Sequence, residues 1–230
     1  MRRCPSRILL KVSGEAFKSD DGALSPEAFA RMAGKIAPLP LETAIVVGGG
    51  NILRGAQAPW IDRVEADTVG MLATVINAMV LRTALEATGR NTIVQSAVQV
   101  EGLSPISIRD ATAALARGDV VIFAGGTGSP FVSTDTAAAI RAVAIHADLL
   151  AKASNVSGVY DSDPATNANA QRIADLTYAD FLANRYGVMD QVSVEICREH
   201  NLPIEVFAWD RPGVLDNLAQ GTRVGTRISG

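Results

Sequence analysis

The stretch AIVVGGGNILRG, residues 44–55, places three consecutive glycines directly after an apolar run. Ordering glycine costs more conformational entropy than ordering any other residue, and a turn needs only one or two glycines. A third glycine indicates that something must approach the backbone closely. Phosphate groups are the usual ligands of such loops, because several backbone N–H groups can point at one anion. The stretch therefore predicts a strand followed by a phosphate-binding loop.

Two other apolar runs end in the same kind of loop. ILLKVSGEAF, residues 8–17, contains Ser13 and Gly14, and VIFAGGTGSPFVSTD, residues 121–135, carries glycines and hydroxyl side chains up to Asp135. Apolar strands that alternate with helix-length segments favour a largely parallel α/β sheet covered on both faces. Ligands of such sheets bind at the carboxyl ends of the strands. Three such loops at one edge therefore predict a site for several phosphates.

Apolar runs rich in β-branched residues predict the strands, and the segments between them predict the helices. The expected strands are residues 7–12, 43–48, 91–98, 120–125, 149–154, 203–209 and 222–228. The expected helices are residues 25–36, 62–88, 134–146 and 190–200. Ser25 is the expected N-cap of the first helix, with Pro26 at its first position. Because the sequence has no internal repeat and no long linker, residues 1–230 are expected to form a single domain.

The composition excludes several classes of function. Charges of both signs are spread along the chain and sum to −3, which gives no basic surface for nucleic acid or for an acidic membrane. The longest uncharged run, residues 120–134, is shorter than the roughly 18 residues of a membrane-spanning helix. The basic start and the short apolar run after it are interpreted as a first strand, not a signal peptide. Two distant cysteines, Cys4 and Cys197, favour a reducing cytoplasm.

The common nucleotide-binding motifs do not occur in the sequence. No stretch matches G-x-x-x-x-G-K-[ST], and Leu53 and Phe131 stand where the dinucleotide fingerprint needs its third glycine. His146 and His200 are isolated, so no cluster of protein ligands for a metal is expected. A divalent cation would be held by carboxylates and by the phosphates of a substrate. The sequence thus favours a phosphate-handling enzyme outside both motif classes.

Five charged residues, four of them near strand ends or a glycine-rich loop and Asp67 near the start of the long helix, are candidates for phosphoryl transfer, which mainly requires positive charge and positioning. They are Lys11, Arg54, Asp67, Asp135 and Lys152. Buried strands exclude lysine unless it points into a site, and arginine can bind two oxygens of one phosphate. Ordinary alternatives remain open: the cations can be surface residues, Asp67 can favour a helix dipole, and Asp135 can be an N-cap.

Six motifs occur in the order found in one enzyme family. From about residue 8 to residue 226, ILLKVSGEAF, VVGGGNILRG, ADTVGMLATVINAMVLRTALE, GTGSPFVSTDTAA, NVSGVYDSDP and VMD make the chain resemble bacterial uridylate kinases, members of the amino acid kinase family. The resemblance implies a three-layer α/β/α sandwich with a mainly parallel central sheet. It also implies transfer of the γ-phosphoryl group of ATP to UMP with Mg²⁺, in a cytoplasmic homohexamer.

The resemblance further implies roles for individual residues. Lys11 would neutralise charge on the transferring group, Arg54 would clamp phosphate, and Asp135 would orient the lysine or act through the metal. The implied ATP-binding residues are Lys11, Val12, Ser13, Gly14, Gly50, Arg54, Ser154, Asn155, Tyr160 and Asp163. The implied UMP-binding residues are Gly49, Asp67, Thr127, Gly128, Ser129, Pro130, Phe131, Val132, Ser133 and Thr134. In this interpretation the donor and acceptor phosphates share the triple glycine, where any Cβ would hold them apart.

The sequence departs from the family pattern at Ser129, where asparagine is frequent, and at Ser157, where an acidic residue is common. Two other functions remain open. The first is another kinase of the family, acting on carbamate, glutamate or aspartate, although such enzymes usually carry extra length. The second is a nucleotide-binding storage or regulatory protein that has lost turnover. The joint retention of Lys11, Arg54, Asp67 and Asp135 argues against it.

Overall fold

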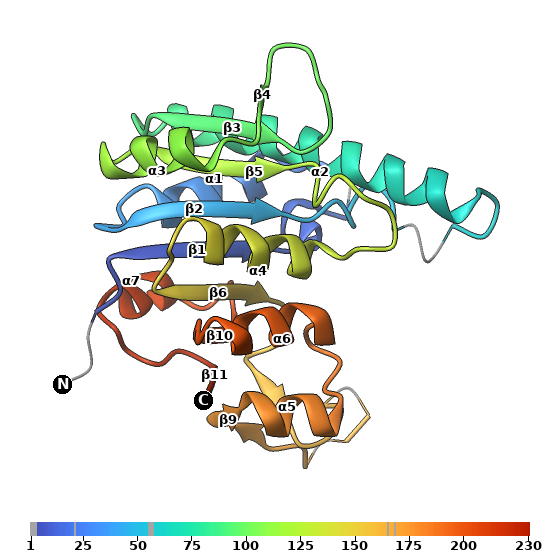
Figure 1. The fold of residues 1–230 in the computed structure, drawn as a ribbon, viewed down its shortest axis with the longest axis vertical. Coiled ribbons are helices and arrows are strands. Elements are labelled where there is room, and N and C mark those ends of the chain that lie inside the picture. The colour runs from blue at the N-terminus through green and yellow to red at the C-terminus, as the bar shows by residue number, and fades with distance from the viewer. Residues whose placement is uncertain (1–3, 21, 55–57, 165, 168) are drawn as a thin grey trace.

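A nine-stranded sheet forms the middle layer of the molecule (Figure 1). The computed structural model describes residues 4–20, 22–54, 58–164, 166–167 and 169–230, so Gly55 of the glycine-rich stretch lies outside the described residues. The strand order is β4 (Ser104–Pro105), β3 (Thr92–Ser96), β5 (Val120–Ala124), β2 (Glu42–Val47), β1 (Arg7–Val12), β6 (Leu149–Ser154), β10 (Ile204–Ala208), β11 (Thr226–Ser229) and β9 (Asp175–Thr177). Within this sheet only β10 and β11 pair antiparallel. A separate antiparallel pair is formed by β7 (Val159–Tyr160) and β8 (Arg172–Ile173).

Helices cover both faces of the sheet, which confirms the predicted three-layer α/β/α sandwich. One face carries α1 (Pro26–Ile36), α2 (Arg63–Glu86) and α7 (Val214–Ala219). The other face carries α3 (Ile108–Ala116), α4 (Thr134–Ala144), α5 (Tyr178–Asn184) and α6 (Gln191–Glu199). In Figure 1, α4 and α6 lie in front of the strands and α2 lies behind them. A 3-10 helix, residues Gly14–Phe17, follows β1 directly.

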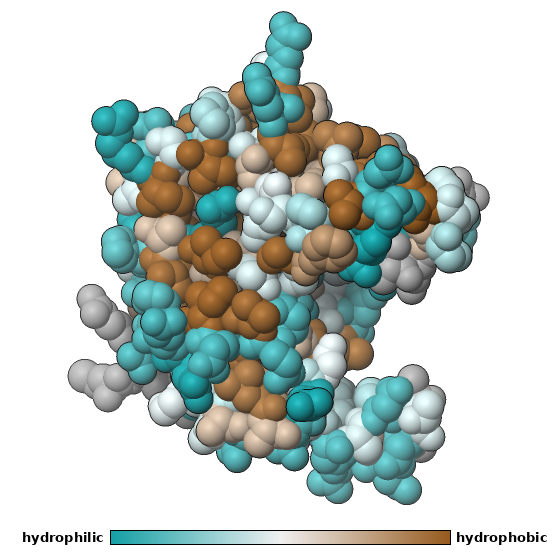
Figure 2. All heavy atoms as spheres, turned by 45° about the vertical axis from the view of Figure 1, so that its right-hand side comes forward, coloured by the Kyte–Doolittle hydropathy of each residue, from teal (hydrophilic) through white to brown (hydrophobic). Residues whose placement is uncertain are grey.

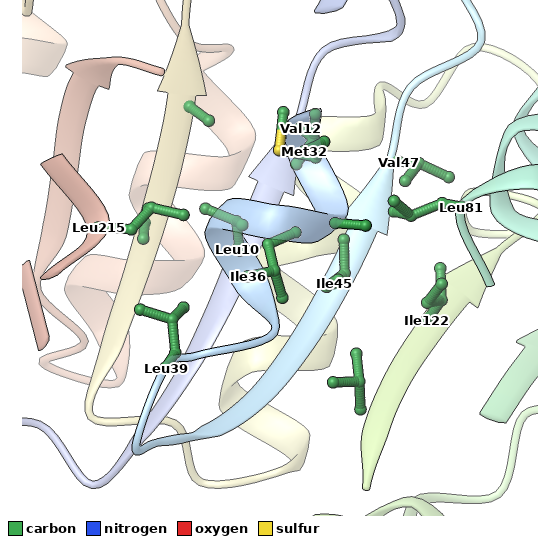
Figure 3. Close-up of a cluster of buried hydrophobic side chains, with 14 of the residues drawn as sticks. Leu10, Val12, Met32, Ile36, Leu39, Ile45, Val47, Leu81, Ile122 and Leu215 are labelled. Atoms are coloured by element: carbon green, nitrogen blue, oxygen red, sulfur yellow. The ribbon is translucent and has the colours of Figure 1, made fainter. Parts of the chain in front are cut away.

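The buried side chains of the central strands alternate between the two faces. Leu10 and Ile45 pack with Ile36 of α1 on one face (Figure 3), whereas Leu9 belongs to the core on the opposite face. Successive residues of a strand point to opposite sides, so Lys11 shares the face of Leu9 and points away from α1. The alternation therefore places the side chain of Lys11 on the α4 side of the sheet.

The long predicted helices are confirmed, and each begins at a polar cap. Ser25 Oγ accepts a hydrogen bond from Ala28 N at 3.2 Å at the start of α1. Asp62 Oδ1 accepts from Val64 N at 2.9 Å at the start of α2. The strands also agree with the prediction to within a few residues, except that β11 begins only at Thr226. The sequence interpretation missed the short elements: β4, β7, β8, β9, α3, α5 and α7.

Helix α2 is the one helix of the described residues that is long and apolar enough to cross a membrane by length and composition. The core helices of globular proteins pass the same test. Its inner face packs on the sheet through the fully buried Leu81 and Leu85, while Leu72, Ile76 and Met79 are exposed on its outer side. Packing against the sheet accounts for the inner apolar residues. That no segment crosses a membrane stays a prediction.

Candidate functional site

The three glycine-rich loops meet at the carboxyl edge of the sheet, where the sequence predicted them. A Cβ placed on Gly14, after β1, would lie 2.7 Å from Gly50 N, after β2. A Cβ on Gly48 would lie 2.9 Å from Gly14 N. The loop after β5 joins them, because Gly126 lines the same cavity as Gly50.

The members of the triple glycine have different neighbours. A Cβ on Gly49 would lie 2.7 Å from Gly70 O of α2, whereas the three atoms nearest to a Cβ on Gly50 all belong to the Arg54 side chain, with Nε at 3.2 Å. None of Gly48, Gly49 and Gly50 has a positive φ, so a left-handed turn conformation is not what requires them. The interpretation that the missing Cβ atoms make room for phosphates is therefore incomplete. Gly48 and Gly49 are needed because the protein backbone packs on itself there.

Two lysines and an aspartate form a buried ionic cluster under these loops. Lys11 and Lys152 are register partners on the neighbouring parallel strands β1 and β6. Lys11 Nζ lies 2.8 Å from Asp135 Oδ1, and Lys152 Nζ donates a short hydrogen bond to Asp135 Oδ2. Ser133, not Asp135, caps α4, since Ser133 Oγ accepts from Asp135 N and Thr136 N at 3.1 Å each. The N-cap alternative for Asp135 is wrong.

The cluster controls the charge of its own members. Burial alone would raise the pKa of Asp135, but the ammonium groups of Lys11 and Lys152 outweigh burial and lower this pKa to about 2. Burial and the nearby charge of Lys11 lower the pKa of Lys152 to about 8, although Asp135 opposes them. Two cations around one carboxylate leave an excess of positive charge beside the N-terminus of α4. This arrangement attracts an anion.

Arg54 is held by an internal ion pair at the rim of the site. Its Nη2 lies 2.8 Å from Glu15 Oε1, and Lys18 Nζ lies 2.6 Å from Glu15 Oε2. The hydrogen bond from Lys18 and, to a smaller extent, that from Arg54 keep the pKa of Glu15 below its usual value, although burial opposes them. The Arg54 side chain is 47% exposed. A phosphate that binds Arg54 has to compete with Glu15.

A cavity of about 420 Å³ lies between the triple glycine, α2 and the loop after β5. It is lined by most of the residues that the resemblance assigned to UMP: Gly49, Asp67, Ser129, Phe131, Val132, Ser133 and Thr134. Thr127, Gly128 and Pro130 belong to the same loop without lining the cavity. The volume is in the usual range of small-molecule sites, roughly 300 to 1,000 Å³.

Asp67 connects α2 to the loop that closes this cavity. Asp67 Oδ2 accepts a hydrogen bond from Phe131 N at 2.8 Å, and Asp67 Oδ1 lies 3.0 Å from Arg63 Nε. Phe131 has a φ of 65°, which is uncommon for a residue with a side chain. The bond to Phe131 lies outside the helix, so an interaction with the helix dipole alone does not explain Asp67.

A second cavity, of about 750 Å³, opens beyond the end of β6. Its lining includes Ser154, Tyr160 and Asp163, which the resemblance assigned to ATP, and Asn155 is exposed next to Ser154. Because β1 lies between β2 and β6 in the sheet, the ionic cluster lies between the two cavities. Figure 2 shows a hollow in the surface between the upper part of the molecule and the lower part, which in Figure 1 contains α5 and β9. Lys11 and Val12 end β1, and Ser13 and Gly14 follow it directly.

The sequence interpretation named Lys152 as a candidate from its place on an apolar strand and left a surface location open. Its side chain is buried and paired with Asp135, so the surface alternative is wrong. Two features of the site escaped the sequence interpretation. Glu15 was not singled out, although it holds Arg54. Thr74 of α2 lines the first cavity; it lies inside the stretch ADTVGMLATVINAMVLRTALE, but the sequence interpretation assigned it no role.

The residues present fit a divalent cation only together with a phosphorylated substrate. Across the described part of the chain, no group of three or more His, Cys, Asp or Glu residues is placed to hold a metal ion. Both oxygens of Asp135 face lysines. Mg²⁺ commonly binds through one or two carboxylates and the phosphates of a nucleotide, so the phosphates would supply most of its ligands here.

Comparisons with known proteins agree on one family. A family model described as the amino acid kinase family matches residues 6–208. The chain is 44% identical over 229 residues to a uridylate kinase of Stutzerimonas stutzeri, covering 96% of this chain and 93% of that protein. The crystal structure of UMP kinase from Bacillus anthracis superposes with a TM-score of 0.94 at 37% identity, covering 99% of this chain and 97% of that one. UMP kinase from Ureaplasma parvum gives a TM-score of 0.92 at 35% identity, with coverage of 98% and 99%.

Proposed function

Because the chain belongs to the amino acid kinase family, we infer that the two cavities beside the ionic cluster take the two substrates of a nucleoside monophosphate kinase, UMP and ATP. The chain is an enzyme that phosphorylates UMP, which its similarity to uridylate kinases over nearly its full length supports. One observation carries the assignment of the site. The buried cluster of Lys11, Asp135 and Lys152 offers fixed positive charge between the two cavities.

UMP takes the cavity between the triple glycine, α2 and the acceptor loop, by which we mean residues 125–134. Asp67 accepts hydrogen bonds from the ribose hydroxyls. It has room to do so, because a carboxylate offers about four acceptor positions, of which Arg63 and Phe131 use a part. Thr127 to Thr134 surround the uracil and the acceptor phosphate. The backbone of Gly49 faces the same cavity.

ATP takes the cavity beyond β6, with its phosphates running back toward β1. Tyr160 offers a flat face to the adenine base. Asp163 binds the ribose, and Ser154 and Asn155 flank the nucleoside. Val12, Ser13, Gly14 and Gly50 supply backbone contacts to the phosphates. Arg54 exchanges its bond to Glu15 for a phosphate, which its half-exposed position allows.

The transfer forms a bond between a phosphate oxygen of UMP and the γ-phosphorus of ATP, and it breaks the bond from that phosphorus to the β–γ bridging oxygen. UDP and ADP result. Lys11 and Lys152 neutralise the charge on the oxygens of the transferring group, and Asp135 holds both ammonium groups at their places. No general base is needed, because a phosphate monoester with a second pKa of about 6 has already lost its protons at neutral pH.

Mg²⁺ bound to the ATP phosphates adds further positive charge at the transferring group. Asp135 is the carboxylate of the ionic cluster, and it could supply a ligand to Mg²⁺ only by giving up part of a lysine contact. The chain would therefore bind Mg²⁺ weakly without nucleotide. Its own contribution to charge neutralisation comes from Lys11, Lys152 and Arg54.

A coupled assay for ADP release tests the function directly. With MgATP, UMP should be a good acceptor, CMP and dCMP poor ones, and carbamate and glutamate inactive. The Lys11→Ala variant is the control for contaminating kinases, since it removes one of the cluster's cations. Turnover with carbamate or glutamate alone would favour another kinase of the family. Tight binding of UMP and ATP without ADP release would favour the storage function, which the similarity to uridylate kinases does not support.

We also propose a homohexamer in the cytoplasm, on the resemblance to bacterial uridylate kinases. The sequence has just two cysteines, Cys4 and Cys197, far apart along the chain, which favours a reducing compartment. A row of exposed apolar side chains on α2, Val69, Leu72, Ile76 and Met79, supports a contact between subunits, because monomers seldom expose such rows. In sedimentation, Leu72→Glu should yield smaller particles than the parent. Ile140→Glu, which adds the same charge on α4, is the matched control. Dissociation by the control alone would contradict a contact through α2.

A further inference from the structure

Two buried polar side chains of α2 take no part in the chemistry described above. Thr74 and Asn77 lie one turn apart on the inner side of the helix and are 2% and 0% exposed. A buried hydroxyl or amide is costly unless it is hydrogen-bonded, so their partners indicate what they are for. Each reaches a different glycine-rich loop.

Thr74 holds the start of the acceptor loop. Its Oγ1 donates to Met71 O and accepts a hydrogen bond from Gly125 N, both at 2.7 Å. Gly125 has a φ of 76°, and a Cβ there would lie 2.8 Å from Val98 N. The first residue of the loop is therefore enclosed by α2 on one side and by the backbone after β3 on the other.

Asn77 holds the triple glycine. Its Nδ2 donates to Gly48 O and to Asn51 Oδ1 at 2.7 Å each, and its Oδ1 accepts from Asn51 Nδ2 at 3.0 Å. Between these contacts Gly49 packs directly on the helix, where a Cβ would lie 3.1 Å from Thr74 N. The stretch from Gly48 to Asn51 is thus bound to α2 at both of its ends.

We propose that Thr74 and Asn77 are positioning residues that set the separation between the triple glycine and the acceptor loop. An α-helix is rigid, and three residues along it span about 4.5 Å. Two side chains on one helix therefore hold the two loops at a constant spacing. That spacing aligns the phosphate of UMP with the donor phosphates, because misplacement by about 1 Å can cost roughly 100-fold in rate. The inference rests on the proposed binding of UMP between these loops.

The test replaces Thr74 by valine, which keeps the shape of the side chain and removes the hydroxyl. Loss of a buried hydrogen bond should raise the KM for UMP about 10-fold and lower kcat, while the KM for ATP changes less than about twofold. Thr74→Ser keeps the hydroxyl and should restore the parent values. Thr83→Val is the matched control, because the Thr83 hydroxyl donates to Met79 O on the same helix and, among the described residues, to no loop of the site. This control should behave as the parent.

Asn77→Leu extends the test to the triple glycine, which both substrates share. It should raise both KM values and lower kcat, and urea unfolding gives the folded fraction to which the rates are referred. Equal effects of Thr74→Val on the two KM values, or lost stability with unchanged kinetics per folded molecule, would overturn the inference. Titration of UMP into each protein distinguishes failure of this inference from failure of the proposed function. Weaker UMP binding by Thr74→Val than by Thr83→Val supports the positioning role even if no variant makes UDP.

Discussion

The ionic cluster and the rim of the site carry similar charges in opposite settings. Lys11 and Lys152 project from the middle strands of the sheet, are buried, and share one carboxylate. Arg54 and Asp67 lie at the rim, where Glu15 and Arg63 pair with them. Because the cluster is buried, water cannot replace one of its ion-pair partners. The rim can exchange its internal partners for a ligand.

The difference indicates how the work is divided. Buried charges held by rigid strands can stabilise developing charge without rearrangement, which favours the transfer step. Rim charges that are already paired can release one partner as a substrate arrives, at little net cost because exposed ion pairs contribute only about 0 to 1 kcal/mol. We expect substitutions in the cluster to affect folding and turnover together, and substitutions at the rim to affect binding and turnover alone.

The largest effect is expected for Asp135→Asn. Two buried ammonium groups would lose their common counter-ion, and breaking a buried ion pair in this way costs about 3 to 5 kcal/mol of unfolding free energy. The unfolding free energy, measured by urea denaturation, and the rate per folded molecule should both fall. Asp216→Asn changes an exposed aspartate of α7 and is the control. If Asp135→Asn were as stable as the parent, the charges of the cluster, like those of the rim, would contribute little to folding stability.

Arg54→Ala should reduce kcat/KM without unfolding the protein. The loss of one charge-assisted contact is typically about 1.5 to 3 kcal/mol, which is roughly a 10- to 150-fold change. Initial rates and urea unfolding are the measurements, and Arg109→Ala, at an exposed ion pair, is the control. A large loss of stability would place Arg54 with the structural charges instead.

The pH dependence sharpens the same comparison. Burial and Lys11 lower the pKa of Lys152 to about 8, so in the free enzyme its positive charge is lost as the pH rises through that value. If the charge is needed, kcat/KM should fall about tenfold per pH unit above it. Lys152→Arg should move this limb to higher pH, because guanidinium stays protonated. The Lys18→Arg control should not move the high-pH fall of kcat/KM. If Lys152→Arg does not move it either, the titration of Lys152 is not its cause.

Glu15→Gln should have the smallest effect. It removes the carboxylate that competes with phosphate for Arg54, so the KM for ATP should fall about twofold to threefold while stability changes by no more than about 1 kcal/mol. Saturation curves for ATP measure the change. A rise in the KM for ATP would show that Glu15 orients Arg54 for phosphate and does not compete with it.

The fold was largely predictable, and its misses have local causes. β1 and β6 are largely apolar runs, each with one lysine toward its carboxyl end, and α1 is marked by Ser25 and Pro26, so their sequences suffice. β4, β7 and β8 have two residues each, too few for any period, and pair only because the tertiary structure brings partners to them. For α3 a signal existed: Ser107 caps its start and bonds to the Asp110 side chain. Thr177 and Asp180 repeat the pattern at α5.

The site was predictable in its loops and less so in its pairings. Glycine after an apolar run locates the phosphate loops, since chain direction alone brings parallel strand ends together. That Lys152 stands beside Lys11 depends on the register of β1 with β6, two strands separated by more than a hundred residues of sequence. The reach of Thr74 to Gly125 likewise depends on how α2 crosses the sheet. Such contacts leave no trace in local spacing.

The pairing of Lys11 with Lys152 across β1 and β6 also makes turnover a reporter of correct folding. A slip of one residue between these strands would send a lysine into the apolar core on the α1 side, because neighbouring positions of a strand face opposite ways. A misaligned sheet would lose catalysis before its overall secondary structure changed. The specific activity of a refolded preparation therefore measures the fraction of molecules in which β1 and β6 pair in the native register.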